Sequence, residues 1–423
     1  MTAFLILMAL LLLLFSRVPV AFALGGLGLA LMLLGDLSPV MIPQSLYSVV
    51  DSFILLAVPL FLLMSNVLLK GGIGQDLFNA VQSWVGHWPG GLGIATIISC
   101  GVFAAISGSS VATAATIGNV AIAEMSKRGY PKPFVYGLVA AGGTLGILIP
   151  PSIPMIIYGV VTEESIVDLF KAGIGPGIML AGLFILFSFV YASFSKDYKP
   201  IPKASWSIRK KTSLRALPTV LLATVVIGGI YLGVFTPTES AAIGFTVSLI
   251  IVYSLRTMTW QKLKQAVMDS MQTTVTIFLI LAGAKIFGKA ITLYRIPQDI
   301  SVLIGDNISE IGLFIFAVCC VLLLIGLFLE SLSMLLIMMP VLYPSVINMG
   351  IDPIWFGIIF VIMIECALIT PPVGLNLFVI QAVGQARMND VIKGVWPFTL
   401  IMLLSAFIIY WIPSIALFIP YHF

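Results

Sequence analysis

Apolar runs long enough to enter a membrane, separated by short polar turns, make up most of the chain. In its first half, the uninterrupted runs predict single membrane-spanning helices at residues 2–15, 18–34, 53–69 and 177–194. A helix crosses a bilayer with roughly 20 apolar residues. The pattern therefore predicts an all-α polytopic membrane protein rather than a transmembrane barrel, whose strands alternate apolar and polar residues.

Two further apolar runs in this half are interrupted. Residues 91–126 form two arms around the polar turn Ser-Gly-Ser-Ser at 107–110. With about 13 to 15 residues, each arm would reach only about 20 Å, short of the roughly 30 Å of a bilayer core, so we predict a re-entrant hairpin. Residues 134–160 predict one crossing that is broken at the Pro-Pro pair 150–151.

Two stretches between the apolar runs are amphipathic. Residues 72–88 and 259–270 mix apolar with polar positions and hold Trp84, Trp88 and Trp260. Tryptophan is enriched at the depth of the lipid headgroups. Both stretches therefore predict helices that lie along the membrane interface.

The order of these features recurs in the second half of the chain. An offset of 221 residues aligns ILIPPSIP (147–154) with LITPPVGL (368–375) and Ser110 with Ser331. Similar matches follow in order along the chain, which indicates an internal repeat. We predict a first repeat, a basic cytoplasmic linker and a second repeat at residues 1–195, 196–216 and 217–423.

The odd number of crossings predicted for the first repeat would invert the second repeat relative to it. There the pattern predicts a periplasmic-side hairpin at 311–346 and a broken helix at 354–384, whereas the first hairpin lies on the cytoplasmic side. With the amino terminus outside, most of the 21 Lys and Arg residues fall on the cytoplasmic side. Because this follows the positive-inside rule, we predict that both termini are periplasmic.

Composition agrees with a membrane protein and argues against an enzyme. The chain is 60% hydrophobic and 9% charged, whereas soluble domains are about 25% charged. Its 4 Cys residues lie in apolar runs without CxxC spacing, and it has only 2 His residues, so we predict neither disulfides nor a transition-metal site. No phosphate-binding loop occurs, and the serine-rich turn is not a nucleophile elbow. We predict no enzyme activity, no organic cofactor and no nucleic-acid binding.

The four interruptions, two in each repeat, are the candidate functional site. Non-helical backbone at membrane depth is tolerated only when it is buried in protein or lines a wet cavity. It frees carbonyl oxygens as cation ligands, and the amino ends of half-helices favour anions. Because the available ligands are mainly neutral oxygens, we predict sodium as the coupling ion.

The residues at these interruptions define three predicted sites. The first sodium site comprises Ser107, Ser109, Ser110, Gly146 and Ile149. The second, implied by the repeat, comprises Glu330, Ser331, Ala367 and Thr370. The substrate is expected between the hairpin tips, near Ser109, Pro151, Ser333, Pro372 and Asn376.

Three further ionisable residues lie within or at the end of apolar runs. Intramembrane ionisable groups are functional candidates by default. Glu365, one turn before the second break, is either close to the site or a structural partner of a buried hydroxyl. Lys285 and Lys289 end an apolar span, and their long side chains can reach the interface.

Four motifs resemble the large membrane subunit of tripartite ATP-independent periplasmic (TRAP) transporters. They are ISGSSVATAATIG (106–118), GTLGILIPPSIP (143–154), TPTESAAIG (236–244) and ITPPVGLNLFV (369–379). The resemblance covers essentially the whole chain. It implies an ion-transporter-superfamily fold in the bacterial inner membrane, in which a mobile domain carries the hairpins and broken helices past a scaffold. It implies sodium-driven import by this elevator-type movement.

The resemblance also implies partners and a class of substrate. A soluble periplasmic binding protein would deliver an organic acid of the sialic acid or C4-dicarboxylate class. A small four-helix membrane subunit would be a separate chain, because this chain is expected to begin at its first span. Glu330 stands opposite Ser109 in the repeat, so the second ion site is expected to differ from the first. The alternative is a stand-alone sodium/organic-anion symporter of the same superfamily, which would need no binding protein.

Overall fold

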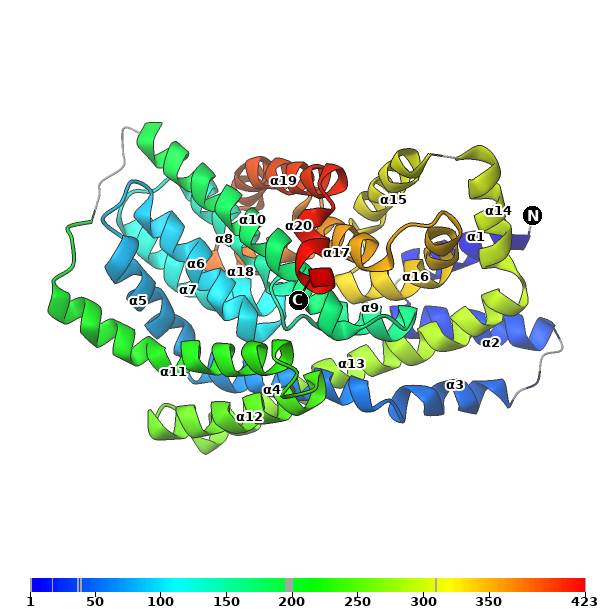
Figure 1. The fold of residues 1–423 in the computed structure, drawn as a ribbon, viewed down its shortest axis with the longest axis horizontal. Coiled ribbons are helices and arrows are strands. Elements are labelled where there is room, and N and C mark those ends of the chain that lie inside the picture. The colour runs from blue at the N-terminus through cyan, green and yellow to red at the C-terminus, as the bar shows by residue number, and fades with distance from the viewer. Residues whose placement is uncertain are drawn as a thin grey trace.

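The computed structural model describes residues 2–16, 18–35, 38, 40–194, 201–308 and 310–422. Within these ranges the chain folds into α-helices and one short 3-10 turn, η1 (Phe53–Leu56). Figure 1 shows an elongated body with the amino terminus at one end and the carboxyl terminus near the middle. The prediction of an all-α protein is confirmed.

One group of helices, here called the scaffold layer, lies along one side of the molecule (Figure 1). It comprises α2 (Val20–Leu34), α3 (Met41–Val50), α4 (Ala57–Lys70), α11 (Trp206–Tyr231), α12 (Pro237–Ser254) and α13 (Trp260–Leu293). In this layer α13 packs along α2, α3 and α4, and α12 packs against α4 and α11. Helices of the first repeat therefore pair with helices of the second.

The two hairpins and the two broken helices form a second group, here called the inner group. In the first repeat it comprises α6 (Gly91–Ser107), α7 (Ser110–Lys127), α8 (Lys132–Leu148) and α9 (Ile153–Thr162). In the second it comprises α15 (Ile311–Ile325), α16 (Ser331–Asn348), α17 (Pro353–Ile369) and α18 (Leu375–Gly384). The remaining helices are α1 (Thr2–Phe15), α5 (Ile73–Val85), α10 (Ile166–Phe194), α14 (Ile296–Asn307), α19 (Met388–Trp411) and α20 (Ser414–His422).

The two repeats share local geometry as well as order. Gly129 and Gly350, one offset apart, both have a positive φ, of 79° and 67°. The Pro-Pro bonds of both breaks, Pro150–Pro151 and Pro371–Pro372, are cis. Across the repeats, α7 packs on α18 and α16 packs on α9. This reciprocal packing is what a two-fold relation between the repeats requires.

The first arm of each broken helix lies at the centre of the fold. Every residue from Phe134 to Leu148 in α8 and from Ile354 to Ile369 in α17 is buried. Helices that are apolar on all faces can be stable only when they are surrounded by other apolar groups. The second arms, α9 and α18, begin after the breaks, and α8 and α9 meet at a bend of 40°.

Several predicted spans have different limits in the structure. Among the described residues, six helices are long and apolar enough to cross a membrane, or seven if the bent pair α8–α9 counts as one span. The runs predicted at 2–15 and 18–34 form helices of only 14 and 15 residues, about 21 to 23 Å long. The span predicted at 177–194 begins earlier, at Ile166, because Pro176 is accommodated inside α10.

The interfacial helix predicted at 259–270 is wrong as a separate element. Its residues are the first turns of α13, which runs for 34 residues without interruption. The corresponding part of the first repeat is divided into α3, η1 and α4. Pro59 lies at the start of α4, and a proline ring clashes with the carbonyl four residues earlier in a continuous helix. Residues 260–293 contain no proline, so α13 continues.

The predicted linker at 196–216 is partly helical. Residues 206–216 form the beginning of α11, whose N-cap, Ser205, accepts a hydrogen bond from the backbone N–H of Ile208 at 3.4 Å. Residues 195–200 lie outside the described part of the chain, as do Met1 and Phe423. The division into two repeats and a linker at these boundaries stays a prediction.

Two glycines allow α8 and α19 to approach at the level of their backbones. A Cβ atom on Gly394 would lie 1.8 Å from the carbonyl oxygen of Pro133, and one on Gly137 would lie 1.9 Å from the carbonyl oxygen of Gly394. Small residues at helix contacts are the usual means of close packing in membranes. The contact ties the first broken helix to α19 of the second repeat.

We expect Gly394→Ala to destabilise the protein by about 1–3 kcal/mol, because the added methyl group forces the two backbones apart. The matched control is Gly182→Ala in α10, where a Cβ atom meets nothing within 4 Å and alanine favours the helix by up to about 1 kcal/mol. Thermal unfolding in detergent measures both. Equal midpoints for Gly394→Ala and the unmodified protein would contradict the close packing described here.

Candidate functional site

A cavity of about 550 Å³ lies where the inner group meets the scaffold layer. Both hairpin tips and both breaks border it, through Gly108 to Ala112, Glu330 to Leu332, Ile147, Ile153, Leu368 and Leu375. The opposite wall belongs to α4 and α13, with the polar residues Ser65, Asn66, Gln272, Thr273 and Thr276. This first cavity is therefore enclosed by residues from both repeats.

Four helices begin at the first cavity. The first residues of α7, α9, α16 and α18 are Ser110, Ile153, Ser331 and Leu375, and all four border it. A helix amino end carries unpaired N–H groups and a partial positive charge. The residues that line the cavity include no Lys or Arg, and Glu330 is their single carboxylate. Helix ends and neutral donors are therefore the groups at this cavity that can favour an anion.

The tip of the first hairpin is shaped by Gly108 and Ser109. Gly108 ends α6 with φ of 58°, and a Cβ atom there would lie 2.6 Å from the carbonyl oxygen of Pro151. Only glycine adopts this left-handed conformation without cost and also leaves room for the approach. Ser109 is the N-cap of α7, and its hydroxyl accepts a hydrogen bond from the N–H of Ala112 at 3.4 Å. The first hairpin tip therefore packs directly against the first break at Pro151.

Oxygen atoms from three residues gather behind this tip. The Thr113 hydroxyl donates to the carbonyl oxygen of Ser109 at 2.8 Å and lies 2.8 Å from the Ser107 hydroxyl. A Cβ atom on Gly146 would lie 2.6 Å from the Ser109 carbonyl oxygen, so the predicted residues Ser107, Ser109 and Gly146 are brought together. Thr113 was not predicted, although its place one helical turn after Ser109 lets its hydroxyl return to that carbonyl.

Ile149, the fifth member of the predicted first site, lies at the break with its side chain turned away from the cavity. Its side-chain carbons face Gly101 of α6 and Gly177 of α10, at 3.4 and 3.0 Å from the Cβ positions of those glycines. Any role in binding an ion would therefore belong to its backbone. Ser110, in contrast, borders the cavity directly.

The predicted second site is less compact. Glu330 and Ser331 border the cavity, while the Thr370 hydroxyl donates to the carbonyl of Cys366 at 2.6 Å and its N–H donates to Ala367 at 3.2 Å. Unlike Ser109, Glu330 makes no side-chain cap for the helix that follows it. The difference between the two tips expected from the sequence is therefore present in their hydrogen bonding.

Carbonyl oxygens of the second break converge on Gly374. A Cβ atom at this residue, whose φ is 48°, would lie 2.8 Å from the carbonyl oxygen of Leu368 and 3.1 Å from that of Thr370. Backbone oxygens freed from helical pairing in this way are potential cation ligands. The first break offers the corresponding tight approach between Gly146 and Ser109.

Most of the residues predicted to contact substrate lie outside the first cavity. Ser109 borders it, but Pro151, Ser333, Pro372 and Asn376 do not. Ser333 is fully buried and donates to the Glu330 carboxylate at 3.4 Å, so it supports a cavity residue from behind. Asn376 is also fully buried, and both polar atoms of its side chain lack a hydrogen-bond partner.

Glu365 is the most deeply buried carboxylate in the described part of the chain. Its side chain is only 1% exposed, and neither carboxylate oxygen has a partner with hydrogen-bond geometry. It faces the hydroxyl of Ser110 in the first hairpin. The residue therefore lies between the second broken helix and the first hairpin tip, directly behind the cavity wall.

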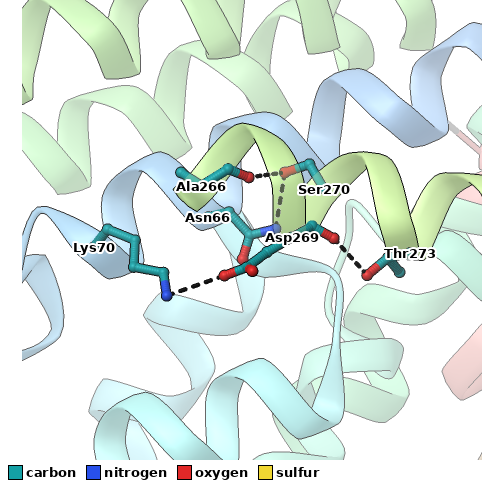
Figure 2. A network of polar contacts seen from close by, with 6 residues as sticks. All are labelled: Asn66, Lys70, Ala266, Asp269, Ser270 and Thr273. Carbon is teal, nitrogen blue, oxygen red and sulfur yellow. Dashed lines mark hydrogen bonds and ion pairs between the residues drawn. The ribbon is translucent and has the colours of Figure 1, made fainter. Parts of the chain in front are cut away.

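A polar network joins α4 to α13 at the opposite wall (Figure 2). The amide nitrogen of Asn66 donates to the Ser270 hydroxyl at 2.9 Å, and Lys70 pairs with Asp269 at 3.0 Å. Asn66 and Thr273 also border the cavity. Sequence reasoning missed this wall, because the polar residues of α4 and α13 meet only through tertiary packing.

A family model describes nearly the whole chain. Residues 7–415 match the model of the "Tripartite ATP-independent periplasmic transporter, DctM component". The chain belongs to this family of TRAP transporter large permeases. It is therefore a multi-pass membrane subunit of a transporter and not an enzyme.

Relatives of this permease are named for different substrates. A C4-dicarboxylate TRAP transporter large permease of Pseudomonas aeruginosa is 39% identical over 89% of this chain and 88% of its own. A sialic acid large permease of Vibrio cholerae is 34% identical over 96% of both chains. An ectoine/5-hydroxyectoine large permease of Ruegeria pomeroyi is 36% identical over 92% of this chain and 91% of its own.

The fold of the permease also resembles a solved transporter structure. The YdaH transporter of Alcanivorax borkumensis superposes with a TM-score of 0.58 over 84% of this chain and 85% of its own, at 14% sequence identity. At this identity the similarity concerns the fold alone. It agrees with the predicted transporter architecture of repeated hairpins and broken helices.

We expect the two contacts between α4 and α13 to respond differently to salt. In a double-mutant cycle of Asn66→Ala and Ser270→Ala, the coupling should be about 0.5–1.5 kcal/mol and independent of salt. The Lys70–Asp269 pair, with side chains 22% and 44% exposed, should lose its coupling near 1 M salt, where the Debye length is about 3 Å. Unfolding in mixed micelles measures both cycles. A vanishing or salt-sensitive Asn66–Ser270 coupling would contradict a buried hydrogen bond at the cavity wall.

Proposed function

We propose that this permease imports an organic anion together with sodium ions, and that the anion binds in the first cavity. The observation that carries the proposal is the convergence of four helix amino ends on one cavity whose lining includes no Lys or Arg. The relatives named for dicarboxylates and sialic acid support an anionic substrate, and ectoine, although a zwitterion, also carries a carboxylate. The substrate carboxylate would lie at the amino ends of α7 and α16.

The opposite wall would recognise the rest of the substrate. Asn66 and Gln272 offer side-chain amides that both donate and accept hydrogen bonds,. The hydroxyls of Thr273 and Thr276 donate to carbonyls of their own helix and can still accept. A cavity of about 550 Å³ falls within the range of about 300–1,000 Å³ that is usual for small-molecule sites. It accommodates a C4-dicarboxylate with room to spare, and its many neutral polar groups also suit a hydroxylated acid such as sialic acid.

Sodium would bind where carbonyl and hydroxyl oxygens gather behind the hairpin tips. In the first site these are oxygens of Ser107, Ser109, Ser110, Gly146 and Ile149, to which the structure adds Thr113. The negative ends of α6 and α8 finish at this place, and helix carboxyl ends favour cations. In the second site Thr370 and the carbonyl oxygens near Gly374 would act with Glu330, Ser331 and Ala367.

Transport would follow from movement of the inner group against the scaffold layer. The hairpins and broken helices pack tightly on each other, whereas the first cavity separates their tips from α4 and α13. An elevator-type movement of the inner group would carry the site past α13. A periplasmic binding protein would deliver the substrate, and a small membrane subunit would accompany the scaffold. In support, a relative that transports isethionate is named DctMQ, and this chain covers 64% of its length.

The direct test is uptake into liposomes that contain this permease and its small membrane subunit. We expect labelled sialic acid or succinate to enter only with an inward sodium gradient and the cognate binding protein. Entry with sodium but without the binding protein would instead establish the stand-alone symporter. No sodium-dependent entry of any organic acid by a folded complex would refute the proposed function.

Substitutions at the first hairpin tip and at the second break should uncouple the permease without preventing its assembly. We expect Ser110→Leu and Thr370→Leu each to reduce sodium-driven uptake at least about tenfold, a loss of about 1.4 kcal/mol of transition-state stabilisation, because a bulky side chain displaces polar oxygens. The control is Ser193→Leu at the exposed end of α10, where the hydroxyl bonds only to its own helix. Unchanged uptake by both Ser110→Leu and Thr370→Leu would disprove the assignment of these sites.

A further inference from the structure

A second cavity, of about 450 Å³, lies farther along α13, on the face that this helix turns toward the inner group. Gln44, Ser45 and Ser48 of α3 form one side, and Leu336 and Pro340 of α16 form the other. From α13 it is lined by Lys285 and Lys289, and the residues around it include no Asp or Glu. Its charge is therefore the opposite of that of the first cavity, which has Glu330 and no cationic side chain.

The side chains of the two lysines border the same cavity. They lie four residues apart, which places them one above the other on one helix face, and both are exposed. Neither makes an ion pair or a hydrogen bond with any residue that the structure describes. Two like charges at this spacing destabilise a helix by about 0.2–0.5 kcal/mol. A bound anion would remove this repulsion.

Lys285 and Lys289 also differ from lysines near helix ends, whose side chains extend to the membrane surface. Lys285 lies eight residues before the end of α13 at Leu293, or about 12 Å along the helix axis. A cation within a membrane helix costs about 2.5–3.5 kcal/mol unless it is paired or faces water. Both side chains face the crevice between the scaffold layer and the inner group, which is the path along which the proposed function moves its substrate.

Two carboxylates lie nearby, and one of them is engaged elsewhere. A neighbouring cavity of about 600 Å³ shares Ser48 and Lys285 with the second cavity and also contains Glu163 and Glu164. Glu164 accepts a hydrogen bond from the Tyr343 hydroxyl at 2.7 Å, and neither glutamate pairs with Lys285. Among the described residues, neither lysine is therefore neutralised by an ion pair, and the side chain of Gln44 lies on the other side of the cavity.

We propose that Lys285 and Lys289 form a second anion-binding site, in which the two ammonium groups and the side-chain amide of Gln44 hold the carboxylate of the transported acid. The first and second cavities lie on one helix, with Thr276 and Lys285 separated by nine residues, or about 14 Å. The substrate occupies the lysine site on one side of the membrane before or after it occupies the helix ends. The identity of the anion rests on the proposed function, whereas the site itself does not.

The first test needs no transport. The purified permease is treated with trinitrobenzenesulfonate, an amine-reactive reagent, and modification of each lysine is followed by peptide mass spectrometry. We expect succinate or sialic acid to slow modification of Lys285 and Lys289, whereas succinamide, the uncharged analogue of succinate, does not. Lys210 and Lys211 of α11, which are exposed, serve as controls and should react at unchanged rates. Equal modification with both acids and with succinamide would overturn the proposal.

The second test uses uptake by the complete transporter. We expect Lys285→Gln with Lys289→Gln to raise the half-saturating substrate concentration about tenfold, the effect of losing one charged contact, while uptake at saturating substrate is largely retained. Lys210→Gln with Lys211→Gln should behave like the unmodified protein, and Lys285→Arg with Lys289→Arg should restore affinity. An unchanged half-saturating concentration in the double glutamine variant would overturn the proposal. If the unmodified protein transports no acid, the proposed function is refuted. The protection of Lys285 and Lys289 from chemical modification then decides by itself whether the lysine site binds anions.

Discussion

The structure depends on one constraint, which is that backbone polar groups inside a membrane must find partners. Helices meet it by internal pairing, and any interruption has to be buried in protein or open to a wet cavity. This permease has four interruptions, and all of them border or directly support the first cavity. Four helix starts border the cavity, while carbonyl oxygens closely approach Gly146 and Gly374.

Because of this constraint, helix ends that favour anions and helix ends that favour cations lie within one small volume. The amino ends of α7, α9, α16 and α18 favour an anion, and the carboxyl ends of the preceding helices favour cations. An anion and sodium ions placed in this way would stabilise each other across the hairpin tips. Coupling between ion and substrate would then follow from this geometry, without a cationic side chain at the first cavity.

The scaffold layer provides the wall that faces the hairpin tips. Its long helix α13 has no proline and runs past both cavities, with neutral polar residues at one and two lysines at the other. The equivalent part of the first repeat is interrupted before Pro59, so the two repeats do not contribute equally to the path. The inner group repeats the conformations of Gly129 and Gly350, but its two hairpins differ, because α6 packs along α7 whereas α15 makes little contact with α16.

Features with a local cause were predictable from the sequence. The breaks at Gly108 and at the two Pro-Pro pairs are encoded by residues that favour turns or end helices, and the repeat showed that they recur. The continuity of α13 was missed because its amphipathic beginning resembles an independent interfacial helix. Asn66, Gln272 and Thr113 were missed because hydroxyl and amide groups are common in membrane helices, and only packing brings these particular ones to the site. Pro372 and Asn376 were expected close to the substrate, but neither borders the first cavity, although Leu375 beside Asn376 does.

The central claim is that the transported anion binds between the hairpin tips at the helix amino ends. Its position is measured most directly by the anomalous scattering of bromine in crystals of the permease with 2,3-dibromosuccinate and sodium. Bromine peaks are expected in the first cavity, next to Ser110 and Ser331. A bromine signal that is absent from the first cavity, including one found at the lysine site alone, would contradict this position.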